Sequence, residues 1–271
     1  MSLKRILVVA SGEAEDAHVL AVSAKFARQH GAVVNVLPAF PDPAAGLVAY
    51  GAAVGASVLD QVVERIQQSE KEAQARLASL GRDVSAAEGV AIEVAPRALQ
   101  PAVALAPAAI LSDLVVFGAA AARAGLAGLF AETLLSTRAP VLLVKDAPFK
   151  SSPIAVAWDG SAQAGRAVRA AMPLLAAADT VVLVRNADDS GAEDAPGMGE
   201  YLRLHGVKAV SEKSVRGERV APSLLAGSSD AGAGVLVAGG YGRPRLYELV
   251  LGGTTRALVN APGGAHLLLA H

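Results

Sequence analysis

The sequence predicts an α/β protein made of two tandem copies of one open domain, each with a parallel sheet of about five strands and helices on both faces. Apolar strand-like runs alternate with amphipathic helical segments along the chain, which is the pattern of a parallel sheet. The same order of elements starts again in the second half. Aromatic residues make up only 4% of the chain, and small apolar residues dominate, as suits helices packed closely on a sheet.

The first elements form a strand, a helix, a second strand and a long helix. RILVVAS, residues 5–11, is a continuous apolar run of the kind buried on both faces of a sheet. Residues 15–31 place apolar side chains at helical spacing and end in Gly31, which predicts a glycine-capped helix. AVVNVLPAF predicts the second strand. Residues 57–81 predict a long amphipathic helix with charged residues on its wet side, closed by Gly81.

The remaining elements of the first copy continue the alternation. They are a third strand in VAIEVAP, a short helix over residues 99–111, a fourth strand in DLVVFG, a helix in LFAETLLSTR and a fifth strand in PVLLVKD.

The second copy follows APFKSSP, a Pro- and Ser-bearing stretch that is typical of a linker. IAVAWDGSAQAGRAVRAAMPLLAAA then repeats the strand, turn and helix of ILVVASGEAEDAHVLAVSAKFA. DTVVLVRNA matches AVVNVLPAF, GVLVAGG matches DLVVFGA, and the terminal HLLLAH matches VLLVKD. We therefore expect two domains, residues 1–149 and residues 150–271.

Composition excludes several classes of function. The 24 Lys and Arg against 25 Asp and Glu give a net charge of -1, which provides no field toward nucleic acid or an anionic membrane. The absence of cysteine excludes disulfides, thiolate metal sites and thiol nucleophiles. The first apolar run, about six residues long, is too short for a signal peptide or a membrane span. We expect a cytoplasmic protein that binds neither nucleic acid nor membrane.

Glycines and an aspartate of the second copy follow predicted strands. Open parallel sheets bind ligands beyond the carboxyl ends of their strands, and Asp159 and Gly239 follow the first and fourth strands. Glycines bring backbone amides close to phosphate oxygens because no Cβ intervenes. Gly252 and Gly253 precede a helix predicted to start near Thr254 or Thr255, and its first N–H groups would favour an anion.

These residues carry a resemblance to the universal stress protein family. Its nucleotide-binding members have a Gly, two residues, a Gly, nine residues and a Gly followed by Ser or Thr, plus an Asp in a D-G-S turn after the first strand. Gly239, Gly242 and Gly252 keep that spacing, and WDGS supplies Asp159. The resemblance covers nearly the whole chain as a tandem pair, because the first copy has the same order of elements.

The resemblance implies a Rossmann-like fold that binds an adenine nucleotide in the second copy. ATP is the expected ligand, with ADP or AMP as alternatives and Mg²⁺ as a companion that the chemistry allows. Asp159 would contact the nucleoside, and Ala157, Trp158 and Val184 would border the base. Thr254 and Thr255 would add hydroxyl donors to the amides of the glycines.

The second copy departs from the family pattern at Gly253, where nucleotide-binding relatives carry Ser or Thr. The missing side-chain donor is worth roughly 1.5 to 3 kcal/mol, so its loss would weaken binding about tenfold or more without abolishing it. Thr254 or Thr255 would have to substitute for it. Arg243 and Arg245 would compensate in part if they pair with phosphate, or else they are simply solvated.

The first copy lacks the signature altogether. Ser11 stands in the place of Asp159, and Ala121 and Ala131 replace the second and third glycines after Gly118. We expect this copy to act as a packing partner rather than as a nucleotide site. Relatives pair two such domains through their final strands, here PVLLVKD and AHLLLAH, and a tandem chain can make that contact internally.

Each site residue also has a purely structural explanation. The glycines would then only turn the chain out of a strand and loosen the loop before a helix. Asp159 would be a turn and helix-capping residue, because D-G-S between a strand and a helix is good capping chemistry. Ser161 is expected to be a cap rather than a nucleophile. The five histidines lack the spacing of metal ligands, so we expect no catalytic and no metal residue.

The function expected from the sequence is a stress-response protein that binds an adenine nucleotide in its second domain and acts as a sensor or regulator, with at most slow ATP hydrolysis. The alternative is a nucleotide-free interaction scaffold that presents its two domains to a protein partner or to another copy of the chain. An adenylating or electron-transfer enzyme would need a further substrate domain or cofactor motif.

Overall fold

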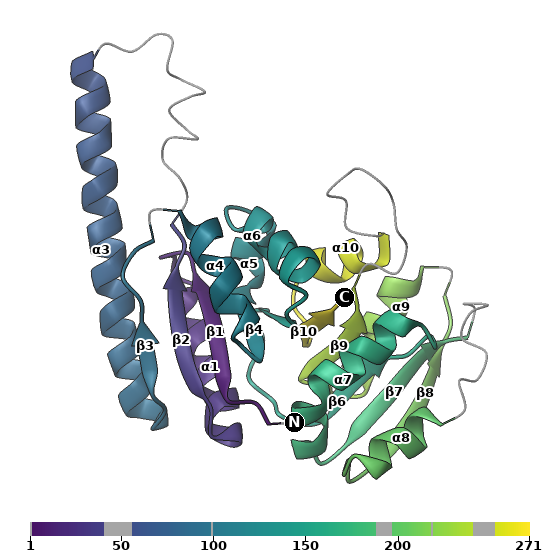
Figure 1. Cartoon of the computed structure of the whole chain (residues 1–271). Helices are drawn as coiled ribbons and strands as arrows, with labels where there is room; N and C mark the ends of the chain where they lie inside the picture. Colours follow the sequence, from purple (N-terminus) through teal and green to yellow (C-terminus); the bar gives the residue numbers. More distant parts are fainter. Residues whose placement is uncertain (1, 41–55, 99, 188–196, 218, 241–252) are drawn as a thin grey trace.

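The computed structural model describes residues 2–40, 56–98, 100–187, 197–217, 219–240 and 253–271. The described strands form one sheet of ten strands in the order β3-β2-β1-β4-β5-β10-β9-β6-β7-β8. Figure 1 shows this sheet running through the molecule, with the N-terminal half (residues 1–149) on one side and the C-terminal half (residues 150–271) on the other. The α/β fold predicted from the alternating pattern is confirmed.

The described residues of the N-terminal half supply five strands. Its elements are β1 (Arg5–Ala10), α1 (Asp16–His30), β2 (Val33–Pro38), α3 (Ala56–Glu88), β3 (Ile92–Val94), α4 (Pro101–Ile110), β4 (Leu114–Gly118), α5 (Ala119–Arg123), α6 (Ala127–Glu132), the π-helix η1 (Thr133–Thr137) and β5 (Val141–Val144).

The C-terminal half repeats this arrangement. Its elements are β6 (Ile154–Ala157), α7 (Ala162–Ala177), β7 (Val181–Asn186), α8 (Met198–Leu204), β8 (Val210–Val215), α9 (Val220–Asp230), β9 (Val235–Gly239), α10 (Gly253–Asn260) and β10 (His266–Ala270). Counted within each half, both sets of strands have the order 3-2-1-4-5. In both halves the strand order therefore reverses between the first and the fourth strand.

The two halves join through their last strands. β5 and β10 are antiparallel, with Leu143 opposite Leu267 and Leu142 opposite Leu268. Every other pair of neighbouring strands in the described residues is parallel. These are the two segments through which relatives were expected to pair, and here they make the sheet continuous across both halves.

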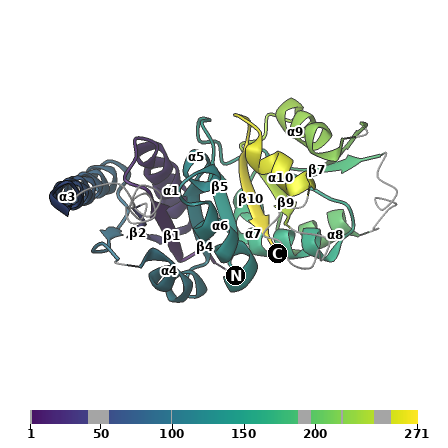
Figure 2. The same ribbon diagram turned by 90° about the horizontal axis from the view of Figure 1, so that it is seen from above.

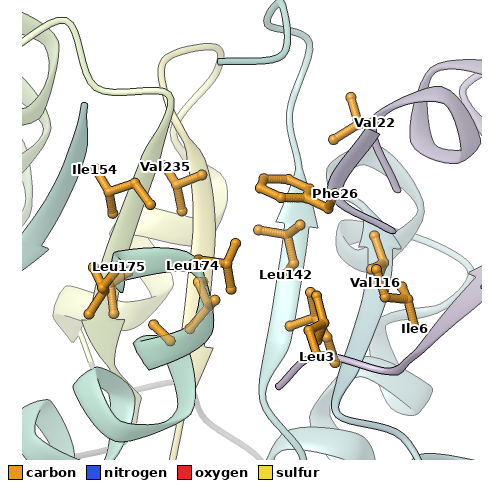
Figure 3. Close-up of a cluster of buried hydrophobic side chains, with 14 of the residues drawn as sticks. Leu3, Ile6, Val22, Phe26, Val116, Leu142, Ile154, Leu174, Leu175 and Val235 are labelled. Atoms are coloured by element: carbon orange, nitrogen blue, oxygen red, sulfur yellow. The ribbon is translucent and has the colours of Figure 1, made fainter. Parts of the chain in front are cut away.

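Helices cover both faces of the sheet, as Figure 2 shows from above. α1, α3, α7 and α8 contribute to one hydrophobic cluster, and α4, α5, α6, η1, α9 and α10 contribute to the cluster on the opposite face. Both clusters contain residues from both halves. In Figure 3, Phe26 and Leu142 of the N-terminal half lie on one side of the junction, and Leu174 and Val235 of the C-terminal half lie on the other. The core is therefore continuous across the junction.

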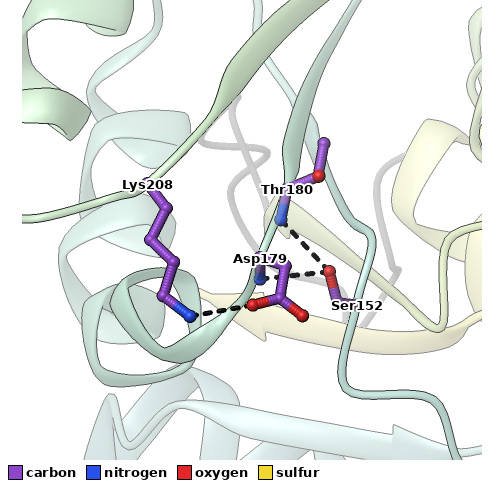
Figure 4. Close-up of polar contacts among 4 residues, drawn as sticks. All are labelled: Ser152, Asp179, Thr180 and Lys208. Atoms are coloured by element: carbon purple, nitrogen blue, oxygen red, sulfur yellow. Dashed lines mark hydrogen bonds and ion pairs between the residues drawn. The ribbon is translucent and has the colours of Figure 1, made fainter.

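The linker between the halves is hydrogen-bonded at the amino ends of the strands, which is the end of the sheet opposite the predicted site. The Ser152 hydroxyl accepts hydrogen bonds from the backbone N–H groups of Asp179 and Thr180 at 3.2 and 3.1 Å, and Lys208 pairs with Asp179 at 2.8 Å (Figure 4). Asp179 and Thr180 precede β7, so these contacts lie at the amino ends of the strands. The carboxyl ends carry no part of this polar group.

One predicted helix end is wrong. α3 does not stop at Gly81 but continues to Glu88, and Gly89, with a φ of +66°, follows it. A Cβ at Gly81 would lie 2.8 Å from Val94 Cγ2 of β3, so this glycine is needed where the helix crosses the strand closely. Figure 1 shows α3 beside β3, extending past the ends of the strands. No helix in the described part of the chain is long and apolar enough to cross a membrane.

Candidate nucleotide-binding site

The site predicted in the C-terminal half starts at the carboxyl ends of β6 and β9. These two strands are parallel neighbours, with Val156 opposite Val237. Trp158 and Asp159 therefore leave the sheet beside Gly239 and Gly240. This is the point at which the strand order reverses, and open α/β sheets bind ligands in the crevice found there. The sequence placed Asp159 and Gly239 after two strands, and the structure brings those strands together.

Asp159 and Ser161 organise the turn from β6 into α7. The Asp159 side chain is exposed, and its Oδ1 accepts a hydrogen bond from the Ser161 backbone N–H at 2.9 Å. The Ser161 hydroxyl accepts from the Ala164 N–H at 3.1 Å and caps α7. The expectation that Ser161 is a cap is confirmed. Asp159 makes the turn expected of the structural explanation, while its second carboxylate oxygen has no hydrogen-bond partner among the described residues.

Gly239 is required by close packing of β9 against the start of α7. A Cβ at this position would lie 2.7 Å from the Ala164 backbone nitrogen and 2.8 Å from the Gln163 carbonyl carbon. Real Cβ atoms are not found so close to backbone atoms, and backbone cannot move aside as easily as a flexible side chain. The chain therefore leaves β9 directly beneath the first turn of α7.

The far end of the predicted site is the first turn of α10. Gly253 and Thr254 are exposed, whereas Thr255 is buried, with 5% of its surface accessible. No atom of the described residues lies within 4 Å of a Cβ placed at Gly253, so the described part of the chain leaves room for a side chain at this position. Gly242 and Gly252, and also Arg243 and Arg245, lie outside the described residues.

The three residues expected to border the base differ in position. Ala157 is half-buried and packs against the cluster that contains α9 and α10. Trp158 belongs to the cluster on the opposite face, and its buried indole Nε1 has no hydrogen-bond partner among the residues that the structure describes. Val184 is fully buried beneath α9, where a Cβ at Gly227 would lie 2.7 Å from its Cγ1. Ala157 and Val184 therefore lie on the face of the sheet that carries α10, and Trp158 lies on the opposite face.

The corresponding place in the N-terminal half holds a carboxylate. Glu15 Oε1 accepts a hydrogen bond from the Ala121 backbone N–H at 2.6 Å, and Oε2 accepts from the Ala120 N–H at 3.2 Å. These amides follow β4, the strand that corresponds to β9. A Cβ at Gly118 would lie 2.5 Å from that carboxylate. The segment after the fourth strand thus binds an anion that the chain itself supplies.

The contact of Glu15 with these amides was not predicted from the sequence. When the first strand of each half is aligned, Glu15 corresponds to Gln163 of the C-terminal half, which has the same shape without the charge. That one difference in the aligned segments was visible in the sequence. Its meaning depends on contacts between residues 105 and 106 positions apart, which no local pattern reveals.

Asp16 closes the loop after β1. Its carboxylate accepts hydrogen bonds from the backbone N–H groups of Gly12 at 2.7 Å and Ser11 at 3.3 Å. Burial raises the pKa of Asp16 to about 6, although the two amide hydrogen bonds act in the opposite direction. With Asp16 and Glu15 both turned onto backbone amides, the N-terminal half satisfies its own loops.

Comparison with known proteins bears on the fold. No protein-family model and no curated protein matches the sequence. Among solved structures, a universal stress protein from Archaeoglobus fulgidus is similar with a TM-score of 0.70 and 19% identity, over 99% of this chain and 96% of that one. The chain has the universal stress protein fold. A proposed universal stress protein from Pseudomonas aeruginosa is similar with a TM-score of 0.52 and 12% identity, over 99% of this chain and 93% of that one.

The resemblance inferred from the glycine spacing is therefore confirmed at the level of the fold. The similarity extends over both halves of the chain, so the universal stress protein fold applies to the tandem arrangement and not to one half alone. In the described residues, no group of three or more His, Asp or Glu side chains is placed to hold a metal ion.

Proposed function

We propose that the chain binds an adenine nucleotide, ATP above all, at the carboxyl ends of β6 and β9, and that it acts as a sensor or regulator in a stress response. The observation that carries this proposal is the carboxylate of Glu15 on two backbone amides in the N-terminal half. It supports an anion-binding role for the segment that follows the fourth strand. In the C-terminal half the equivalent residue is the neutral Gln163, so this position supplies no charge, and in our proposal the phosphates of the nucleotide take the place of the Glu15 carboxylate.

The residues of the C-terminal half fit the parts of such a ligand. Gly239 leaves no side chain between β9 and α7, and Gly253 and Thr254 present the exposed amino end of α10. A helix amino terminus and nearby glycine amides suit phosphate. Asp159 has a carboxylate oxygen available to accept hydrogen bonds from a ribose. The residues of this chain would hold and orient the nucleotide. The fraction of chains with bound nucleotide would then report the nucleotide concentration.

A calorimetric titration with ATP and ADP, with and without Mg²⁺, tests the proposal directly. We expect ATP to bind the wild-type chain. Gln163→Glu should raise the Kd for ATP at least about tenfold, because it places a negative charge beside Gly239 as Glu15 lies beside Gly118. Gln163→Ala is the matched control and should bind like the wild type. An ATP affinity unchanged by Gln163→Glu, or no binding to the wild type, would refute the site.

A further inference from the structure

The carboxyl end of α10 is held by two cations of the N-terminal half. Lys145, which follows β5, donates from Nζ to the Leu258 carbonyl at 3.0 Å, and Arg123, the last residue of α5, donates to the Asn260 carbonyl at 3.4 Å. The last carbonyls of a helix lack partners within the helix and form the negative end of its dipole. Leu258 has a further reason to need an outside donor, because the residue four positions on is Pro262, which has no N–H.

Lys145 is an unusual anchor because its charge is buried. Only 2% of its surface is accessible, and no carboxylate pairs with it among the described residues. Burial, and to a smaller extent the nearby positive charge of Arg123, lower the pKa of Lys145 to about 8. A lysine keeps a buried ammonium group only where specific acceptors offset part of the loss of hydration. The acceptor here is α10.

Contacts from both halves in turn hold the residues that support α10. Arg123 ends the short helix α5, whose first amides are bound by Glu15. The backbone of Lys145 is held on both sides, because its N–H donates to His266 Nδ1 at 3.2 Å and its carbonyl accepts from His18 Nε2 at 3.1 Å. Lys145 and Arg123, which support α10, are therefore themselves placed by hydrogen bonds to their own backbone or to the helix that carries them.

α10 links these supports to the proposed phosphate end of the site. The helix spans eight residues, Gly253–Asn260, so its exposed first turn lies only about 12 Å from its anchored last turn. A short helix moves as one body, and a tilt at one end displaces the other. The direction in which Gly253 and Thr254 face is thus set partly by contacts of Leu258 and Asn260.

We propose that Lys145 is a positioning residue for nucleotide binding, through which the N-terminal half orients α10 toward the ligand. The inference rests on the proposed function for its ligand, but the anchoring of α10 has its own readout. It gives the N-terminal half, which lacks the glycine signature, a defined part in the site of the C-terminal half.

The test compares Lys145→Met with Leu142→Ala. Methionine keeps much of the length of the lysine and removes its charge and its hydrogen bond to Leu258. Leu142 lies in β5 at the same junction, but its side chain belongs to the cluster on the face opposite α10, so its truncation weakens the junction without touching the helix. We expect Lys145→Met to speed amide hydrogen exchange in α10 and to raise the Kd for ATP about tenfold. Leu142→Ala should leave the Kd for ATP unchanged. Its amide exchange in α10 should change only as far as its lower global stability speeds exchange throughout the protein.

A pH profile provides a readout that a merely structural role would not change. Between pH 7.5 and 9.5 the wild-type Kd for ATP should rise as Lys145 loses its proton, whereas the Kd of Lys145→Met should stay constant. The other groups that face Lys145 are Arg123 of α5, His18 of α1 and His266 of β10, and all three are unchanged in both proteins. Equal Kd values and equal α10 exchange in Lys145→Met and the Leu142→Ala control would overturn the proposal.

The two proposals fail separately. If the wild-type chain binds no ATP, the proposed function is wrong, and exchange in α10 still decides whether Lys145 anchors the helix. If ATP binds the wild type and Lys145→Met leaves both α10 exchange and the pH profile unaltered, the positioning role is wrong while the nucleotide site stands.

Discussion

Two glycines of the candidate site serve different purposes at the level of single residues. Gly239 has backbone atoms of Gln163 and Ala164 where a Cβ would be, so no other residue fits without displacing α7. At Gly253 no atom of the described residues lies near the position of a Cβ, and the residue is at an exposed helix start. Packing therefore excludes a side chain at Gly239, whereas the described residues would accept one at Gly253. The departure from the family signature at Gly253 is therefore one that this structure can reverse.

Gly253→Ser should tighten ATP binding. The serine hydroxyl would add a hydrogen-bond donor to the first turn of α10, and a hydrogen bond to a charged group is worth roughly 1.5 to 3 kcal/mol, or about tenfold in Kd. Gly253→Ala fills the same space without a hydroxyl and should leave the Kd near that of the wild type. Calorimetry on both variants separates the two effects. Equal Kd values for serine and alanine would mean that this position does not face the ligand.

At the level of elements, each half places the start of its first helix against the end of its fourth strand. In the N-terminal half Gly118 of β4 lies against the flexible carboxylate of Glu15, which precedes α1. In the C-terminal half Gly239 of β9 lies against the backbone of α7 itself. The contact between the fourth strand and the first helix can therefore adjust more easily in the N-terminal half. There a side chain fills the contact, whereas in the C-terminal half the helix backbone does.

Alanine at these two glycines should have unequal effects on stability. Gly239→Ala should lower the free energy of unfolding by about 1–3 kcal/mol, because the new methyl group overlaps backbone atoms that can move only with α7. Gly118→Ala should cost less than about 1 kcal/mol, since the half-buried Glu15 can turn into water and water can bind the exposed Ala120 amide. Urea denaturation of both variants measures the difference. A larger loss for Gly118→Ala would contradict the packing argument.

The elements also show which features a sequence reveals. Strands such as β1 and β4 are buried on both faces, so their sequences are apolar without interruption and their positions could be predicted. Gly81 was mistaken for a helix end because glycine at a cap and glycine at a close crossing look alike in sequence. Glu15 and Lys145 escaped prediction because their partners, Ala121 and Leu258, are 106 and 113 positions away. Local sequence patterns are enough to predict strands. The geometry of the site depends on contacts between segments that are far apart in the sequence.

For the whole molecule, the antiparallel pairing of β5 and β10 gathers basic residues at the junction of the two halves. His266 is fully buried there, its Nδ1 accepts from the Lys145 N–H, and its ring lies 6.2 Å from that of His18. Burial, and to a smaller extent the nearby His18 and Lys145, lower the pKa of His266 to about 4. The proton of the neutral ring lies on Nε2, which has no partner in the described structure.

The sign of the resulting pH dependence follows from that lowered pKa. In the unfolded chain His266 takes up a proton near its ordinary pKa of 6.5, whereas in the folded chain it does so only near 4. Between these values the unfolded state binds more protons, so stability falls as the pH falls from 6.5 to 4. Asp16 acts in the opposite direction, because its raised pKa of about 6 makes the folded state take up its proton first.

A variant at His266 isolates this contribution. His266→Asn keeps an acceptor close to the position of Nδ1 for the Lys145 N–H but does not titrate, so its stability should decline less than that of the wild type between pH 6.5 and 4. The difference between the two curves should reach at most about 3 kcal/mol, the free energy of a pKa shift of this size. Asp16 is present in both proteins and cancels in the comparison. Urea denaturation at several pH values from 7 to 4 gives the two curves, and curves that stay parallel would show that His266 is not the group through which acid weakens the junction.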